Sequence, residues 1–228
     1  MASAWDLADT ALASSNRLYL WGPPGVGKSY LAVKSGQAPV QVTFSEDLTV
    51  QELIGHYMPE GGVFRWHYGP ISQAMRDGAL LILNEIARAS GAVQDFLLGV
   101  LDNAEVASIA LPTGEKLRPA RGFCVVATSN TSPESLDPAL RSRFEVEIHL
   151  TEPNPAIITN LNQSLRGLGE ALKDSFKDPS RALDPRKLRA FMSLIRSGVL
   201  ARPAALMTFG DQAPDLMAVL TARGIRFA

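Results

Sequence analysis

Residues 17–29 read RLYLWGPPGVGKS, and this stretch decides the fold. An apolar run at 18–21 leads into a glycine-rich segment at 22–29 that fits the pattern G-x-x-x-x-G-K-[ST]. Glycines let the backbone turn so tightly that its N–H groups converge on a phosphate chain. A helix that begins near Gly27 points its positive end at the same anion. The order of strand, loop and helix therefore predicts a phosphate-binding loop and disfavours an ordinary glycine turn.

Length and composition bound the class of protein. The 228 residues suffice for one large domain, or for one domain with a small appendage. A hydrophobic content of 46% and a charged content of 20% are typical of a soluble globular protein with a sizeable core. The net charge of −1 makes nucleic acid an unexpected partner, although a local basic patch stays open.

The chain carries a single cysteine, Cys124, which excludes an intrachain disulfide framework. The first residues lack the pattern of a secretory signal, and no apolar run is long enough to span a bilayer. These features favour a cytoplasmic protein without a membrane segment.

Strand and helix patterns alternate through the first two thirds of the chain. Besides the run at 18–21, strands are expected at 39–44, 79–83, 123–127 and 144–150. Helices are expected at 3–15, 29–35 with a stop at Gly36, 49–54 capped by Thr49, 70–76, 90–103 capped by Ser90, and 135–143. The continuous apolar runs ALLIL and FCVVA are typical of central parallel strands that are buried on both faces.

Two segments interrupt this alternation. The aromatic stretch 55–69, with Gly61 and Gly62 at its centre, predicts a hairpin or an ordered loop, and 105–119 predicts a hairpin that turns at 112–114. The aromatic side chains of 55–69 either pack within the hairpin or face a partner. Its two histidines lack a nearby Cys or acid at ligand spacing, so no metal site is expected there.

After Pro153 the pattern becomes helical, with helices expected at 155–168, 185–197, 203–209 and 212–223. The predicted fold class is α/β. It comprises a P-loop NTPase core with a parallel sheet flanked by helices at 1–152, and a small C-terminal all-α lid at 153–228.

Polar residues follow two of the predicted central strands. Glu85 comes just after the run ALLIL, and Asn130 lies at the tip of the strand that contains FCVVA. Ligands of open α/β sheets bind beyond the carboxyl ends of the strands. Glu85 can orient or deprotonate an attacking water, and Asn130 can position that water or contact a γ-phosphate.

The set GPPGVGKS, LLILNEIARA, VVATSN and LDPALRSRF resembles an AAA+ ATPase. The sequence between these motifs, including 69–103, is similar to the MoxR-like branch of that family. This branch includes the CbbQ and NorQ type activators and is related to the dynein-type modules. The resemblance covers roughly residues 15 to 225, and it is strongest up to Phe144.

The resemblance assigns roles to particular residues. It implies that Glu85, Asn130, Arg143 and Arg186 are catalytic. Glu85 matches the Walker B glutamate, Asn130 matches sensor 1, and Arg186 matches sensor 2. Arg143 matches the arginine finger, and its neighbour Arg141 could share that role. It implies ATP and Mg²⁺ as cofactors, with Ser29 and Asn84 at the metal. The residues expected to bind ATP are Gly22, Pro23, Pro24, Gly25, Val26, Gly27, Lys28, Ser29 and Tyr30.

One position departs from the family. Walker B usually ends in Asp-Glu, and here it reads Asn84-Glu85. Asparagine keeps a carbonyl acceptor but loses the negative charge, so Mg²⁺ binding should weaken and hydrolysis should slow.

The leading functional hypothesis is an ATP-driven, chaperone-like remodeller or activator of a partner protein. The resemblance implies a homo-oligomer, a hexameric ring, and a separate protein substrate or adaptor such as a von Willebrand factor A domain protein. Recruitment would use surface loops such as 55–69 or 105–119. An ATP-binding scaffold with weak hydrolysis is the alternative, favoured by Asn84. A DNA-directed loader is a third hypothesis, and salt-dependent DNA binding would revive it.

Overall fold

The computed structural model describes residues 2–33, 39–178 and 182–225. They form two compact units. The first comprises the described residues of 1–22 and 28–149, and the second those of 23–27 and 150–228. The middle of the glycine-rich stretch therefore clusters with the C-terminal part of the chain.

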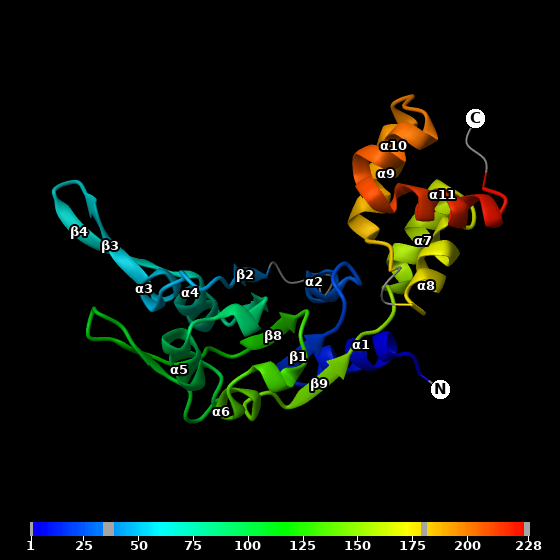
Figure 1. Cartoon of the computed structure of the whole chain (residues 1–228). Helices are drawn as coiled ribbons and strands as arrows, with labels where there is room; N and C mark the ends of the chain where they lie inside the picture. Colours follow the sequence, from blue (N-terminus) through cyan, green and yellow to red (C-terminus); the bar gives the residue numbers. More distant parts are fainter. Residues whose placement is uncertain (1, 34–38, 179–181, 226–228) are drawn as a thin grey trace. The chain divides into compact units, whose positions relative to one another are not determined.

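A parallel five-stranded sheet forms the centre of the first unit (Figure 1). Its strand order is β2-β5-β8-β1-β9. The strands are β1 (Arg17–Trp21), β2 (Val40–Thr43), β5 (Leu80–Asn84), β8 (Cys124–Ser129) and β9 (Val146–His149). The inner strands β5 and β8 are buried along most of their length, as their continuous apolar runs predict. The predicted parallel sheet is confirmed.

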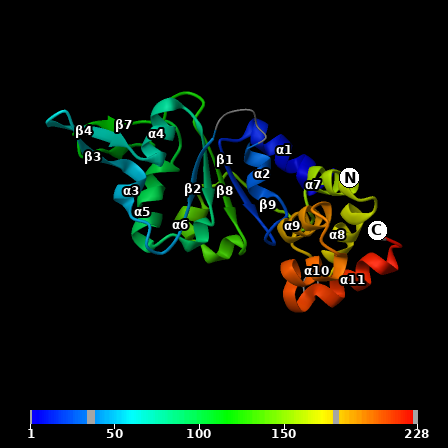
Figure 2. The same cartoon turned by 90° about the horizontal axis from the view of Figure 1, so that it is seen from above.

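Helices cover both faces of this sheet. In Figure 2, α4 and α5 lie on one side of the strands, and α1 and α2 lie on the other. The helices are α1 (Ala4–Ser14), α2 (Lys28–Val33), α3 (Val50–Ile54), α4 (Pro70–Asp77), α5 (Gly91–Val100) and α6 (Pro138–Arg141), with 3-10 turns at Ile86–Arg88 and Pro133–Ser135. The expected stop of α2 at Gly36 falls outside the described residues.

Helices α1 and α3 each begin with a side-chain cap that makes reciprocal hydrogen bonds. Thr49 caps α3 as predicted, because its hydroxyl accepts from the Glu52 N–H while the Glu52 carboxylate accepts from the Thr49 N–H. The prediction that the Ser90 side chain caps α5 is wrong. Ser90 occupies the N-cap position, but its side chain makes no capping hydrogen bond. Burial of Val93, Leu97 and Val100 against the sheet therefore holds that helix, at about 1.5–3 kcal/mol for each fully buried large apolar side chain.

Both predicted hairpins are confirmed. β3 (Gly55–Glu60) pairs with β4 (Val63–Tyr68), and the ribbon projects away from the sheet of the first unit (Figure 1). The turn is made by Gly61 and Gly62, whose φ angles of 58° and 84° suit glycine. A shorter hairpin joins β6 (Ile109–Ala110) to β7 (Lys116–Leu117).

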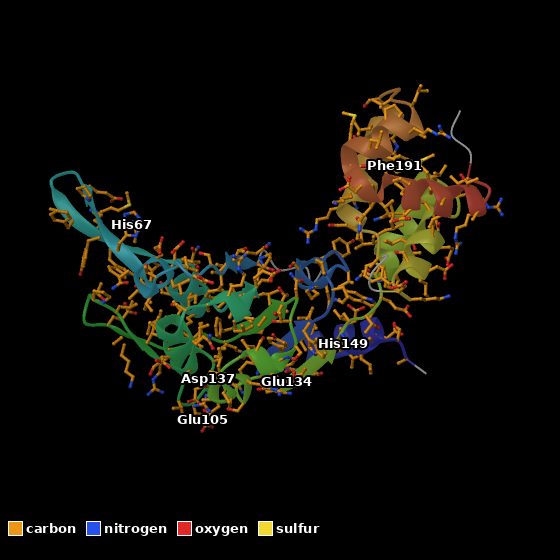
Figure 3. All side chains as sticks on the ribbon, viewed as in Figure 1. His67, Glu105, Glu134, Asp137, His149 and Phe191 are labelled. Carbon is orange, nitrogen blue, oxygen red and sulfur yellow. The ribbon has the colours of Figure 1, made fainter. Side chains whose placement is uncertain are left out.

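The aromatic side chains of the longer hairpin differ in how far they are buried. Trp66 is half-buried and contacts Tyr57 edge-on, with ring centroids 5.2 Å apart. Phe64, further out on the ribbon, is 74% exposed. His67 is paired with Glu60 at 2.7 Å on this projecting ribbon, where it is labelled in Figure 3. The base of the hairpin is therefore packed, and its outer part is open to solvent.

The second unit is helical after Leu150, as predicted. Its helices are α7 (Pro155–Ser164), α8 (Leu168–Ser175), α9 (Pro185–Arg196), α10 (Ala201–Phe209) and α11 (Ala213–Ala222), with a 3-10 turn at Gly210–Gln212. Phe191 of α9, labelled in Figure 3, is fully buried with Leu188 and Leu216 in its core. None of the helices in the described part of the chain is long and apolar enough to cross a bilayer.

One helix of this unit was placed wrongly from the sequence. The expected helix 155–168 ends at Ser164, and a separate helix α8 begins after Gly167. Gly167 adopts a left-handed φ of 85°, which breaks the helix. Gly169 then lets α8 approach α7 closely, since a Cβ at this position would lie 2.3 Å from the Ile158 carbonyl oxygen.

Candidate nucleotide-binding site

The carboxyl ends of neighbouring parallel strands bring the predicted site residues of the first unit together. Asn84 is the last residue of β5, and Asn130 directly follows β8. The register pairs Asn84 with Thr128. The Gly22 N–H donates to the Ser129 carbonyl at 3.3 Å, so the glycine-rich stretch begins at this same edge. The sheet thus forms a polar edge where an α/β fold binds its ligands.

A chain of three side chains runs along this edge. The Lys28 ammonium donates to the Gly22 carbonyl and to Asn130 Oδ1, each at 2.8 Å. Asn130 Nδ2 in turn donates to Glu85 Oε1 at 2.8 Å. Lys28 is buried, at 7% exposure, which requires acceptors around its charge. The structure therefore joins the predicted phosphate ligand Lys28 to the predicted catalytic pair, Asn130 and Glu85.

Glu85 has an unusual backbone. Its φ of 56° and ψ of 40° are left-handed, and among the described residues other than glycine no further positive φ occurs. A non-glycine residue in this region costs about 1–3 kcal/mol, and such residues concentrate at functional sites. The strain lies at the junction of β5 and the following 3-10 turn, where it directs the carboxylate toward Asn130.

The predicted metal residues are in direct contact. Ser29 Oγ donates to Asn84 Oδ1 at 2.5 Å. The same oxygen accepts from Thr128 Oγ1 at 3.3 Å, and Thr128 is 2% exposed. Sequence reasoning missed Thr128, because only the strand register reveals that it lies beside Asn84.

The middle of the glycine-rich stretch, residues 23–27, belongs to the second unit and packs against the start of α9 in that unit. Gly22, Gly25 and Gly27 have φ angles of 145°, 80° and 107°, which suit glycine. A Cβ at Gly25 would lie 2.7 Å from Pro185 Cδ and 3.0 Å from Asp184 Oδ1. The first turn of α9 therefore packs so closely on this stretch that it leaves no room for a side chain at Gly25.

These groups fit a nucleotide with a divalent cation. Hydroxyl and amide oxygens at Ser29 and Asn84 are hard donors of the kind that Mg²⁺ takes, and Mg²⁺ is usually held by few protein ligands together with substrate phosphates. In the described part of the chain no group of three or more His, Cys, Asp or Glu residues could hold a metal ion by itself. A cation at this edge would therefore share its coordination with phosphate oxygens.

The two candidate arginine fingers have different partners. Arg143 Nη2 lies 3.3 Å from Asp102 Oδ2, and its buried Nε finds no hydrogen-bond partner among the described residues. Arg141 donates two hydrogen bonds to Glu147, both at 2.8 Å, and these raise the pKa of its guanidinium. Arg143 precedes β9, so it lies at the amino ends of the strands, opposite the polar edge.

Two further predicted residues, Arg186 and Tyr30, have exposed side chains. Arg186 is the second residue of α9, and its side chain is 73% exposed, with Nε 4.0 Å from Asp184 Oδ1. Its N–H is capped by the Asp184 carboxylate at 2.8 Å. Tyr30 of α2 is 41% exposed.

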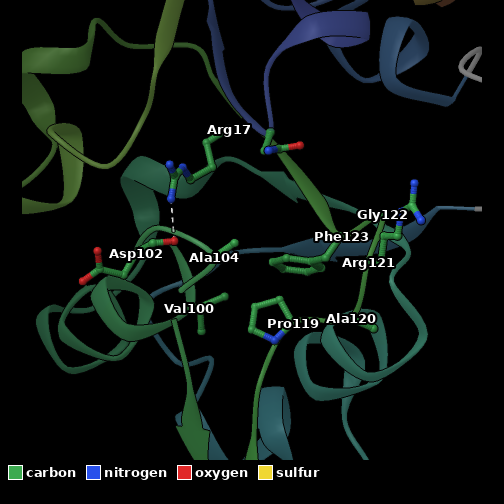
Figure 4. Close-up of a pocket in the computed structure, with 10 residues that line it drawn as sticks. Arg17, Val100, Asp102, Ala104, Pro119, Ala120, Arg121, Gly122 and Phe123 are labelled. Carbon is green, nitrogen blue, oxygen red and sulfur yellow. Dashed lines mark hydrogen bonds between the residues drawn. The ribbon is translucent and has the colours of Figure 1, made fainter. Parts of the chain in front are cut away.

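A small cavity of about 180 Å³ lies near the start of β1 (Figure 4). Its apolar side is formed by residues such as Val100, Pro119 and Phe123. Arg17 closes one end by donating to the Asp102 carbonyl at 2.5 Å. None of the residues predicted for the site lines this cavity. Asp102 connects it to Arg143, a link that the sequence does not reveal.

Comparison with known proteins agrees with this geometry. The family described as AAA domain (dynein-related subfamily) matches residues 17–144, which include the glycine-rich stretch, the polar edge and Arg143. The chain therefore belongs to the dynein-related subfamily of AAA domain proteins.

Three of its relatives, NorQ, CbbQ and NirQ, are MoxR-like AAA+ proteins. The chain is similar to protein NorQ of Paracoccus denitrificans (strain Pd 1222), with 33% identity over 156 residues that cover 65% of this chain and 57% of NorQ. Protein CbbQ of Hydrogenophilus thermoluteolus is 35% identical over 85 residues, 36% of this chain and 32% of CbbQ. The denitrification regulatory protein NirQ of Stutzerimonas stutzeri is 26% identical over 214 residues, 85% of this chain and 77% of NirQ. The matches thus span less than two thirds of NorQ and of CbbQ.

Solved structures share the fold. NtrX from Brucella abortus in complex with ATP superposes with a TM-score of 0.56 at 16% identity, over 86% of this chain and 52% of NtrX. A RuvB point mutant from Thermotoga maritima gives a TM-score of 0.50 at 16% identity, over 96% of this chain and 67% of RuvB. These likenesses establish the P-loop NTPase-like architecture.

Proposed function

We propose that this chain binds ATP with Mg²⁺ and hydrolyses it slowly. The observation that carries the proposal is the convergence of Lys28, Ser29, Asn84, Glu85 and Asn130 at one edge of the sheet, linked by short hydrogen bonds. Membership of the AAA family and the ATP bound to NtrX support the choice of nucleotide. The glycine-rich stretch 22–29 and Tyr30 would hold the nucleotide.

Each residue of the polar edge has a role in this proposal. Lys28 binds the phosphates, and Asn130 positions the attacking water or the γ-phosphate. Glu85 orients that water or accepts its proton. Ser29 and Asn84 would hold Mg²⁺, which when bound neutralises charge on the phosphate oxygens.

Asn84 makes the proposed hydrolysis slow. Its amide oxygen accepts the Ser29 hydroxyl as a carboxylate would, so the contact survives. The negative charge that attracts a cation is lost. We therefore expect weaker Mg²⁺ binding than at an Asp-Glu site, with Glu85 still available for turnover.

Arg143 and Arg186 belong to a wider assembly in this proposal. Arg143 lies at the amino ends of the strands, away from the polar edge of its own sheet, so it would serve a neighbouring copy. Head-to-tail contacts with a closing rotation form rings, and the family resemblance favours a homohexamer. Residues 153–228 would act as a lid, with Arg186 sensing the nucleotide.

The biological task that we propose is the remodelling or activation of a partner protein. The similarity to NorQ and CbbQ is the ground for this task. A von Willebrand factor A domain protein is one kind of partner that we propose from the family resemblance. The outer part of the β3–β4 hairpin offers a contact surface, since Phe64 is 74% exposed and Val63 is 55% exposed.

A nucleotide-gated scaffold with little hydrolysis is the second candidate, and Asn84 is the observation that favours it. Both the remodeller and the scaffold would bind ATP, but only the remodeller would hydrolyse it at an appreciable rate. ATP binding by calorimetry, phosphate release, and size-exclusion light scattering with and without ATP separate them. Binding, turnover and assembly together support the remodeller. Binding and assembly without turnover support the scaffold, and absence of ATP binding overturns both.

A further inference from the structure

The backbone N–H and C=O groups of the β3–β4 ribbon point alternately toward the partner strand and away from it. The turn at residues 61–62 has positive φ at both positions, so it closes on a hydrogen-bonded pair, Glu60 and Val63. Such pairs recur at every second position of an antiparallel ladder. The Gly69 N–H donates to the Ile54 carbonyl at 3.0 Å, and these two residues fall on the same series of alternate positions. The alternation is therefore fixed at both ends of the ribbon.

Strand β4 consequently has an open edge. Phe64 and Trp66 fall between the hydrogen-bonded pairs, so their backbone N–H and C=O groups point away from β3. The ribbon is a two-stranded sheet, and no further strand in the described part of the chain pairs with it. The outer edge of β3 is blunted, because Pro59, the partner of Phe64, has no N–H. Strand β4 therefore offers the edge at which an extended chain can add as a third strand.

The side chains on the two faces of β4 define the chemistry of such a chain. Phe64 and Trp66 lie on one face, and Phe64 is 74% exposed. Arg65 lies on the other face, where its side chain is 68% exposed and 3.4 Å from Glu60. A guanidinium carries five donors, so this contact leaves donors for a second acid. Because neighbours on one face of a sheet contact each other, a strand that alternates apolar and acidic residues matches both faces.

We propose that the open edge of β4 binds an extended segment of a partner protein by strand addition. The segment alternates apolar and acidic residues. Its backbone pairs with Phe64 and Trp66, its apolar side chains contact the aromatic face, and an acidic side chain contacts Arg65. Main-chain hydrogen bonds supply affinity in this mode, and the alternating side chains supply specificity. The inference rests on the proposed contact surface of the hairpin and adds the binding mode and the class of peptide.

The probe is a fluorescein-labelled peptide of alternating valine and glutamate residues, titrated with the full chain in the presence and absence of Mg·ATP. Fluorescence anisotropy should show saturable binding. At saturation, exchange of the Phe64 and Trp66 amide protons should slow by about tenfold, the effect of one hydrogen bond. The Arg65 N–H is the internal control, because it already faces Met58 across the ribbon. A peptide with lysine in place of glutamate should bind roughly fivefold more weakly, since it places like charges together.

Two further comparisons separate backbone pairing from side-chain contact. One peptide carries N-methyl groups on every valine nitrogen, and a second carries them on every glutamate nitrogen. Alternate N–H groups of a strand face opposite edges, so one of the two peptides should bind about tenfold more weakly than the other. In the protein, Phe64→Pro removes the outward N–H, and Phe64→Ala is the matched control that keeps it. Phe64→Pro should bind the unmodified peptide about tenfold more weakly than Phe64→Ala, with the backbone spectrum otherwise unchanged.

The outcomes distinguish strand addition from other modes of binding and from the proposed ATPase. Equal binding of the two N-methylated peptides, or equal binding by Phe64→Pro and Phe64→Ala, would mean docking through side chains alone and would overturn strand addition. A dimer of the protein alone that Phe64→Pro abolishes would give the edge to a second copy and would overturn the partner. Absence of peptide binding while ATP still binds contradicts strand addition only. Peptide binding without ATP binding contradicts the proposed ATPase and leaves strand addition standing.

Discussion

Ser29 Oγ and Asn84 Oδ1 lie 2.5 Å apart, with the hydroxyl donating to a neutral amide oxygen. The distance shows that the hydroxyl in the first turn of α2 and the last residue of β5 are in direct contact, as expected for two ligands of one cation. Asn84 keeps the contact but lacks the negative charge of a carboxylate. A comparison with aspartate at this position therefore measures what that charge contributes to cation binding.

Replacement of Asn84 by aspartate should restore that charge without changing the shape of the side chain. We expect the Mg²⁺ concentration for half-maximal turnover to fall roughly tenfold, since one added negative charge near a divalent cation contributes at least about 1.4 kcal/mol. Turnover measured across a Mg²⁺ titration checks this. An unchanged Mg²⁺ dependence and rate in Asn84→Asp would show that charge at this position does not matter.

Arg143→Ala should lower turnover by about 10³ to 10⁵, the contribution of an arginine supplied by a neighbouring subunit. ATP binding to dilute protein should stay the same, because Arg143 lies away from the polar edge of its own sheet. Arg141→Ala tests the other candidate finger. Because Arg141 is engaged with Glu147 and Glu134, we expect its replacement to lower turnover less than Arg143→Ala does. Turnover is followed as a function of protein concentration. A monomer of Arg143→Ala with wild-type activity would argue against an assembled site.

Gly25→Ala should destabilise the second unit. A methyl group there would lie 2.7 Å from Pro185 Cδ on a backbone with φ of 80°, and we expect a loss of about 1–3 kcal/mol with weaker ATP binding. Gly62→Ala shares the positive φ of 84° but has open space around it, so its cost should be backbone strain alone, about 1 kcal/mol. Chemical denaturation measures both. Equal losses in the two variants would mean that the contact with α9 is absent in solution.

The β3–β4 hairpin should separate into a structural base and a free outer part. Phe64→Ser is expected to change the free energy of unfolding by less than about 0.5 kcal/mol and to leave the turnover of the isolated protein unchanged. Trp66→Ala should cost about 1–3 kcal/mol, because the half-buried ring packs on Tyr57 and the core. Denaturant unfolding of both variants checks this contrast. A large loss in Phe64→Ser would show that its ring is covered in solution.

The sheet and its polar edge were predictable because strand periodicity and strand ends are local features. The runs ALLIL and FCVVA predict buried strands, and the ends of neighbouring parallel strands must meet, so the sequence alone places Glu85 and Asn130 close together. The hydrogen bonds among Lys28, Asn130 and Glu85 were not predictable, since they depend on side-chain orientation rather than on position.

Long-range and conformational features also escaped the sequence. The pairing of Arg143 with Asp102 joins two connecting segments that lie far apart in the sequence, and no local pattern signals it. The break before α8 depends on the left-handed Gly167, which also fits a tolerated glycine inside a helix. Ser90 illustrates a different error. A serine is suited to capping and occupies the N-cap position of α5, but its side chain does not make the capping hydrogen bond.

Hydrolysis at the polar edge is tested most directly by ATP turnover with Mg²⁺, comparing the wild type with Glu85→Gln. Glutamine keeps an oxygen that can accept from Asn130 and removes the charge needed to act on water. We predict measurable wild-type turnover that falls by about 10² to 10⁴ in Glu85→Gln while ATP affinity is retained. Equal turnover in the two proteins would contradict the role of Glu85 and the hydrolytic site built around it.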